Sequence, residues 1–105
     1  MKVSDCSVLI IDDVSSVREY LRQTLMLLGI NKVSEAANGT LGINSYNAQQ
    51  QDVVFLDIEL PDCDGKSLLR QLKEINPQAN VVIMTAHSTV ENVQQSILAG
   101  ACGFI

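Results

Sequence analysis

The chain has 105 residues, a formal net charge of −5 and a hydrophobic fraction of 47%. This length allows one domain, and the apolar content is sufficient for a core, which excludes an intrinsically disordered chain. The acidic balance and the lack of any cluster of lysines and arginines exclude a protein that binds nucleic acid directly through its phosphates.

The N-terminal segment MKVSDCSVLIIDD contains a short apolar run that ends in two aspartates, with no small-residue cleavage site. It is therefore not a signal peptide. Because no apolar run approaches the roughly 20 residues that cross a bilayer, we expect a cytoplasmic protein with no membrane partner. The three cysteines, Cys6, Cys63 and Cys102, have no C-x-x-C spacing, so we expect reduced thiols without a chemical role.

Short apolar runs of four residues predict buried strands at Val8–Ile11, Val53–Leu56 and Val81–Met84. These runs are rich in β-branched residues and none alternates with polar residues, which is typical of a parallel sheet covered by helices on both faces. The segment Lys32–Ala36 alternates weakly and carries charge, which predicts an edge strand. The final residues, Gly103–Ile105, predict the start of a fifth strand.

Helical patterns separate these strands. In the first helix, Ser15 or Ser16 is placed to cap the start and Gly29 to end it. Residues 40–49 form a weaker pattern, and two further apolar stripes at helical spacing consist of Leu68, Leu72 and Ile75, and of Val90, Val93 and Ile97. The order β-α-β-α-β-α-β-α-β predicts an α/β domain with an open parallel sheet and right-handed crossovers.

Acidic residues gather where two of the buried runs end. Asp12 and Asp13 follow the first run, and Asp57 ends the second. Thr85 and Ala86 follow the third run. Because the carboxyl ends of parallel strands lie at one edge of a sheet, where ligands bind, we expect the three aspartates to converge there beside Thr85.

Clustered carboxylates repel one another, and without compensation at least one of them would take up a proton. A hard divalent cation held by oxygen atoms compensates the charge, and Mg²⁺ is the cation that accepts one or two carboxylates while it keeps several waters. The alternative is that the acidic residues, which also include Glu59, Asp62 and Asp64, cap turns and helices.

At these residues the chain resembles the CheY-like receiver domain of bacterial two-component response regulators. The matching segments are LIIDDVSSVR, VVFLDIELPDCDG, VVIMTAHSTV and AGACGFI, and the resemblance covers the whole chain, residues 1–105, as a single domain. It implies a doubly wound, flavodoxin-like parallel sheet of five strands in the order 2-1-3-4-5. It also implies a signalling phosphoacceptor with a histidine kinase or phosphotransfer protein as donor and with a downstream effector that the sequence does not name.

The resemblance implies a metal and phosphoryl site made of four residues. Asp57 matches the aspartate that accepts the phosphoryl group and also contacts Mg²⁺. Asp13 matches the carboxylate that binds Mg²⁺ directly, and Asp12 matches its neighbour, which acts largely through water. The backbone carbonyl of Glu59 matches the third protein ligand of the metal. Such a domain is no conventional enzyme, because it catalyses only its own phosphorylation and dephosphorylation.

The resemblance also implies a switch. Thr85 matches the hydroxyl residue that bonds the phosphoryl group and moves on activation, and Phe104 matches the aromatic switch residue. The positions of Glu59 and His87 tune how long the phosphoryl group survives. Ala86 is small, which leaves room for Thr85 to approach the phosphoryl group.

The sequence departs from the family pattern at its C-terminal end. The lysine of the family is expected two positions after Ile105, and the last crossover helix would follow, so we expect a C-terminally incomplete domain. Since burial is worth about 25 cal/mol per Å², a sheet face left bare beside the first helix predicts marginal stability or self-association as a homo-oligomer.

Two other functions fit parts of the same pattern. A phosphatase of the haloacid dehalogenase type also has a nucleophilic aspartate after an apolar strand and a threonine or serine at another strand end. In that family, however, the nucleophile follows the first strand, whereas Asp57 ends the third. A truncated interaction module that does not react is the other alternative, favoured by the missing lysine.

Overall fold

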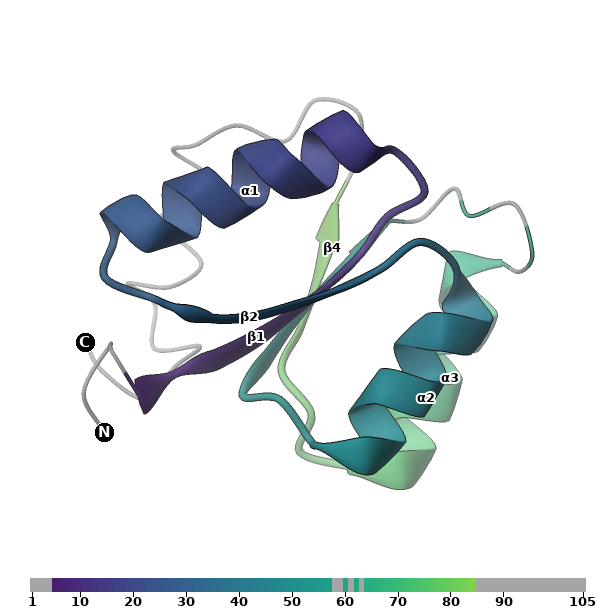
Figure 1. The fold of residues 1–105 in the computed structure, drawn as a ribbon. Helices are drawn as coiled ribbons and strands as arrows, with labels where there is room; N and C mark the ends of the chain where they lie inside the picture. The colour runs from purple at the N-terminus through teal and green to yellow at the C-terminus, as the bar shows by residue number, and fades with distance from the viewer. Residues whose placement is uncertain (1–4, 58–59, 61, 63, 85–105) are drawn as a thin grey trace.

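The computed structural model describes residues 5–57, 60, 62 and 64–84. Within these residues, strands and helices alternate along the chain (Figure 1). The elements are β1 (Ser7–Ile11), α1 (Ser15–Leu27), β2 (Lys32–Ala36), α2 (Gly39–Ala48), β3 (Val53–Asp57), α3 (Gly65–Ile75) and β4 (Val81–Met84). No helix among the described residues is long and apolar enough to cross a membrane.

The four described strands form one parallel sheet in the order β2-β1-β3-β4. Helix α1 covers one face, and α2 and α3 cover the other (Figure 1). This arrangement confirms the doubly wound, CheY-like flavodoxin fold, and it places the predicted edge strand β2 at an edge of the described sheet. The predicted fifth strand and the helix before it lie outside the described residues.

The core has two layers because successive side chains of a strand point to opposite faces. Val8 and Ile10 of β1 pack with α1, whereas Leu9 and Ile11 pack with α2 and α3, and all four side chains are fully buried. The central strands are therefore apolar and buried from Val8 to Ile11 in β1 and from Val53 to Leu56 in β3. Polar side chains that follow them come out at the edge of a rigid sheet.

Helix α2 approaches β1 very closely at Gly42. A Cβ atom added at this glycine would lie 2.6 Å from Cδ1 and 2.9 Å from Cγ1 of Ile11. Because Ile11 directly precedes Asp12, this contact sets the distance between α2 and the functional end of β1.

The start of helix α1 differs from the sequence prediction. Neither Ser15 nor Ser16 caps the helix; Val14 is the N-cap residue and makes no side-chain capping bond. Instead, Oδ1 of Asp12 accepts a hydrogen bond of 2.8 Å from the amide of Val14. The expected stop at Gly29 is confirmed, since this glycine has a φ of 91°, a conformation that L residues rarely adopt.

The prediction of three reduced thiols is wrong for Cys6, which is fully buried and disulfide-bonded. Its partner lies outside the described residues. Sequence spacing identifies local cysteine motifs only, and the fold decides which distant thiols meet.

Candidate functional site

The three predicted aspartates meet at one edge of the sheet. Asp12 and Asp13 directly follow β1, and Asp57 is the last residue of the neighbouring strand β3. Because Ile11 pairs with Leu56 in parallel register, the next residue of each strand emerges at the same level. One carboxylate oxygen from each aspartate lies within 4.8 Å of the other two.

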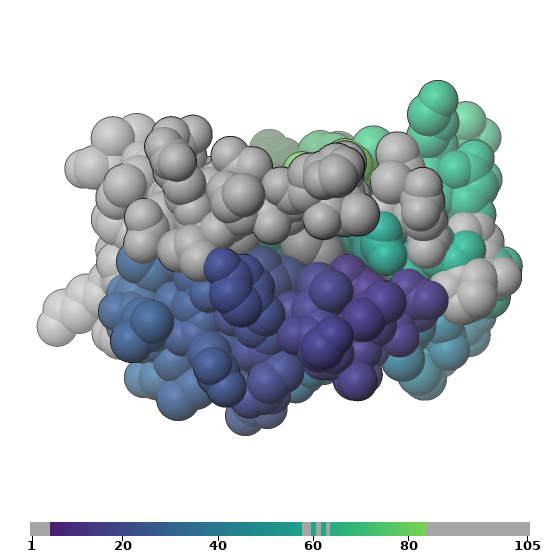
Figure 2. Space-filling model, turned by 90° about the horizontal axis from the view of Figure 1, so that it is seen from above, coloured from purple at the N-terminus to yellow at the C-terminus, as the bar shows by residue number. Residues whose placement is uncertain are grey.

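The space-filling view shows the surroundings of this edge. Purple residues around the end of β1 and the start of α1 lie close to teal residues, the colour of the chain around β3 (Figure 2). The end of β1 and the end of β3 therefore open onto the same part of the surface.

The three carboxylates differ in exposure to solvent. Asp12 is buried, Asp57 is half-buried and Asp13 is exposed. Burial raises the pKa of Asp12, and the nearby charges of Asp57 and Asp13 raise it further, whereas the bond from the Val14 amide lowers it. A full set of negative charges at this site is therefore costly without a cation.

The donor set fits a hard divalent cation. Three carboxylate oxygens, graded from buried to exposed, suit an ion such as Mg²⁺, which takes few protein oxygens and keeps waters on its open side. The site has no sulfur or imidazole donor among its three residues, so it is not built for a softer metal.

Two other acidic residues near the edge have a different task. Asp62, in the loop after β3, accepts bonds from the amides of Gly39 and Thr40 at 2.9 and 3.2 Å, and one of 3.1 Å from the Thr40 hydroxyl. These donors, the Gly39 amide foremost, lower the pKa of Asp62. Asp64 caps α3 through a bond of 3.1 Å from the amide of Lys66. The alternative that these acids cap helices therefore holds for Asp62 and Asp64.

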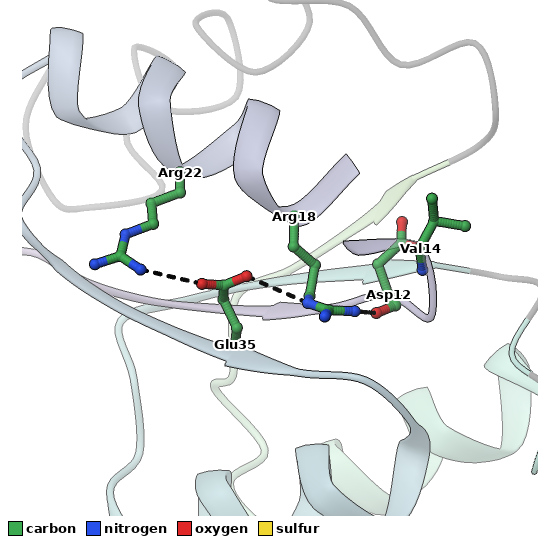
Figure 3. Close-up of polar contacts among 5 residues, drawn as sticks. All are labelled: Asp12, Val14, Arg18, Arg22 and Glu35. Carbon is green, nitrogen blue, oxygen red and sulfur yellow. Dashed lines mark hydrogen bonds and ion pairs between the residues drawn. The ribbon is translucent and has the colours of Figure 1, made fainter. Parts of the chain in front are cut away.

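Sequence reasoning did not single out Arg18. Its guanidinium Nη1 donates a hydrogen bond of 2.6 Å to the main-chain carbonyl of Asp12, and its Nε donates one of 3.2 Å to Glu35 of β2 (Figure 3). An arginine six positions after the first aspartate, in the first turn of the helix, was the available signal. The predictions for Glu59, Thr85, Ala86, His87 and Phe104 concern residues outside the described part of the chain.

Comparison with known proteins identifies the family of the chain. A family model described as the response regulator receiver domain matches residues 8–105. The chain belongs to this family. Receiver domains of two-component response regulators are signalling modules of a phosphoacceptor family, and they interact with kinases or phosphotransfer proteins.

Individual relatives agree with this assignment. The receiver domain is 34% identical over 98 residues to the chemotaxis protein CheY of Bacillus subtilis (strain 168), covering 93% of this chain and 82% of that protein. It is 32% identical over 94 residues to sporulation initiation phosphotransferase F of the same strain, covering 90% and 75%. A crystal structure of the CheX-CheY-BeF3-Mg+2 complex from Borrelia burgdorferi is similar, with a TM-score of 0.74, 29% identity, and coverage of 90% of this chain and 72% of that chain.

Proposed function

We propose that this receiver domain accepts a phosphoryl group on Asp57 and uses Mg²⁺ held by the acidic edge of the sheet. The observation that carries the proposal is the convergence of Asp12, Asp13 and Asp57 within 4.8 Å at the ends of two central strands. A chain without use for these charges would place neutral turn residues after buried strands, because clustered carboxylates destabilise the fold.

Each of the three aspartates has a distinct part in the proposed reaction. Asp57 is fixed by the last pair of β3 with β4, so one of its oxygens can approach phosphorus in line. As that oxygen forms its bond to phosphorus, the bond from phosphorus to the donor histidine nitrogen breaks. Asp12 and Asp13 would hold the metal together with Asp57, and the backbone carbonyl of Glu59 would be a further ligand. Mg²⁺, when bound, neutralises charge that develops on the phosphoryl oxygens.

The remaining residues of the proposal transmit or tune the signal. Thr85 would bond the phosphoryl group, and its movement would be coupled to Phe104. Glu59, Ala86 and His87 would set how long the acyl phosphate survives. The donor is a histidine kinase or a phosphotransfer protein, and the family assignment supports this class of partner. The proposed phosphorylation and dephosphorylation are reactions of the domain on itself.

Mass measurement tests the phosphoacceptor directly. The protein is incubated with Mg²⁺ and a small acyl phosphate donor, and its intact mass is recorded before and after treatment with hydroxylamine, which cleaves acyl phosphates. We expect one labile phosphoryl adduct in the wild type and in Asp62→Asn, whose substituted carboxylate is outside the cluster. Asp57→Asn should show none. An equal labile adduct in Asp57→Asn would contradict the assignment.

The same samples distinguish the receiver from the phosphatase alternative. A phosphatase would hydrolyse a generic phosphomonoester with sustained turnover, and it would lose that turnover in Asp57→Asn. A receiver should accept the phosphoryl group from an acyl phosphate without turnover of the phosphomonoester. Lack of any adduct together with lack of Mg²⁺ binding would favour the non-reactive interaction module.

A further inference from the structure

The backbone of Asp12 is hydrogen-bonded on both sides. Its amide donates to the carbonyl of Ala36 at 3.0 Å, which continues the pairing of β1 with β2. Its carbonyl accepts the bond of 2.6 Å from Arg18 (Figure 3). The carbonyl of Asp12 and the amide of Asp13 belong to one planar peptide unit. The bond from Arg18 therefore fixes the orientation of the peptide that leads into Asp13.

Arg18 is itself held in place from the neighbouring strand. Its Nε lies 3.2 Å from Oε1 of Glu35, and the second oxygen of Glu35 lies 3.3 Å from Nη1 of Arg22. The side chain of Arg18 is 16% exposed, compared with 49% for Arg22. Glu35 precedes Ala36, so β2 fixes Asp12 twice, once through its main chain and once through the pair of Glu35 with Arg18.

A guanidinium suits this task because its donors lie in one plane with fixed directions. One edge of the group faces the carboxylate of Glu35, and another nitrogen reaches the carbonyl of Asp12. A bond between a charged donor and a carbonyl in a half-buried place is stronger than a neutral one. The loop between β1 and α1 is thereby tied to β2 immediately beside the acidic cluster.

We propose that Arg18 is a positioning residue for the metal site, acting through the peptide between Asp12 and Asp13 to keep both carboxylates aligned with Asp57. This inference rests on the proposed function, because it assigns Mg²⁺ to the acidic cluster. It differs from the ligand assignments, since Arg18 touches neither the metal nor the phosphoryl group.

A purely electrostatic role would have the opposite consequence. The positive charge of Arg18 interacts with the carboxylate of Asp12 and would compete with Mg²⁺ for it. If charge were its only contribution, removing it would tighten Mg²⁺ binding. If Arg18 positions the ligands, removing it weakens binding, because two of the three carboxylates lose their fixed geometry. The sign of the change separates the two roles.

The experiment is a Mg²⁺ titration of the wild type and four variants, followed by amide resonances in NMR spectra. We expect Arg18→Met to bind Mg²⁺ about tenfold more weakly, the lower end of the range for residues that orient metal ligands. Arg18→Lys should recover part of the affinity, and Glu35→Gln should weaken binding less than Arg18→Met. The matched control is Arg22→Met, which removes an equal charge from the same ion-pair network without touching Asp12, and its affinity should stay within about twofold of the wild type.

The metal-free spectra provide a second readout. The amide resonance of Asp13 should move in Arg18→Met and stay in place in Arg22→Met. Tighter or unchanged Mg²⁺ binding in Arg18→Met would overturn the inference, as would an unmoved Asp13 amide. If Arg18→Met does not fold, unchanged affinity in both Arg18→Lys and Glu35→Gln would overturn it equally. If the wild type binds no Mg²⁺, both the proposed function and the positioning role are refuted. If the wild type binds Mg²⁺ and the variants do not weaken this binding as expected, only the positioning role of Arg18 is refuted.

Discussion

Asp12 and Asp62 lie at the same end of the sheet in opposite electrostatic environments. Asp12 is buried beside two other carboxylates, and burial raises its pKa. Asp62 is exposed and receives hydrogen bonds from Gly39 and Thr40 at the start of α2, and these bonds lower its pKa. The two acidic residues at this edge of the sheet therefore have different roles. Asp12 is kept at a cost, which the proposed function explains by Mg²⁺ binding, and Asp62 stabilises the start of α2.

The difference follows from the elements that carry the two residues. Asp12 directly follows a central strand, so its backbone cannot move away from that of Asp57 without breaking the sheet. Asp62 belongs to a loop and reaches the unpaired amides at the start of a helix, where a negative charge is favourable. A carboxylate surrounded by hydrogen-bond donors, such as Asp62, stabilises the fold. A carboxylate surrounded by other carboxylates, such as Asp12, requires a cation to compensate the charge.

The largest expected effect that separates the two aspartates is on metal binding. Asp12→Asn should weaken Mg²⁺ binding at least about tenfold, because it removes a buried charge from the donor set. Asp62→Asn should change the affinity less than about twofold. Isothermal titration calorimetry of both variants measures the difference. Comparable losses of Mg²⁺ affinity in the two variants would contradict the assignment of Asp12 to the metal site and of Asp62 to the start of α2.

Mg²⁺ should also stabilise the wild type against unfolding. Ligand binding to the folded state alone adds about 2.7 kcal/mol at a concentration of 100 times the dissociation constant. The gain should disappear with a chelator, persist in Asp62→Asn and shrink in Asp12→Asn at the same Mg²⁺ concentration. Thermal unfolding with and without the metal measures it. An equal gain in Asp12→Asn would place the cation elsewhere.

A smaller effect concerns the helix that Asp62 holds. Gly42→Ala should lower the free energy of unfolding by about 1–3 kcal/mol, because the added methyl group would meet Cδ1, Cγ1 and Cγ2 of Ile11 at 2.6–3.2 Å. The gain in helix propensity, about 1 kcal/mol, does not offset a clash with a whole side chain. Asn47→Ala, at an exposed position of the same helix, is the control and should be neutral or slightly stabilising. Denaturant unfolding of the two variants compares them, and an unchanged midpoint in Gly42→Ala would mean that the side chain of Ile11 makes room for the methyl group without a net cost.

Much of the fold and part of the site could be predicted from the sequence. The uninterrupted runs of β1, β3 and β4 predict buried strands, and parallel strands necessarily bring the residues after them to one edge. The convergence of Asp12, Asp13 and Asp57 therefore follows from topology, without knowledge of any side-chain contact. The edge strand was predicted from its weak alternation and its charges, and the three described helices from the helical patterns between the strands.

Contacts between distant segments could not be predicted in this way. Asp62 bonds residues that lie 22 and 23 positions earlier, and Arg18 meets Glu35 across 17 positions. Such pairs depend on how loops and helices pack, which apolar periodicity does not encode. The prediction of a serine cap for α1 was also wrong: the helix begins at Ser15, Val14 stands at the N-cap position, and its side chain makes no capping bond.

The smallest expected effect, and the most specific, is the pH dependence of stability without metal. The pKa of Asp62 is lower in the folded chain than its ordinary value of 3.8, so its stabilising contribution is complete above that value and is lost as the pH falls through the lower, folded pKa. Asp62→Asn offers one acceptor oxygen where the carboxylate uses two, so it should be less stable than the wild type at neutral pH, with a deficit that closes on acidification.

The pKa of Asp12 is raised, so its charge destabilises the folded chain above that pKa and the cost disappears as the pH falls through it. Asp12→Asn should therefore be more stable than the metal-free wild type at neutral pH, with an advantage that also closes on acidification. Thermal midpoints of the three proteins, recorded in chelator from about pH 7 to pH 3 by circular dichroism, give both differences. At neutral pH we expect a lower thermal midpoint than the wild type for Asp62→Asn and a higher one for Asp12→Asn. If both midpoints shift in the same direction, the two carboxylates do not have opposite electrostatic environments.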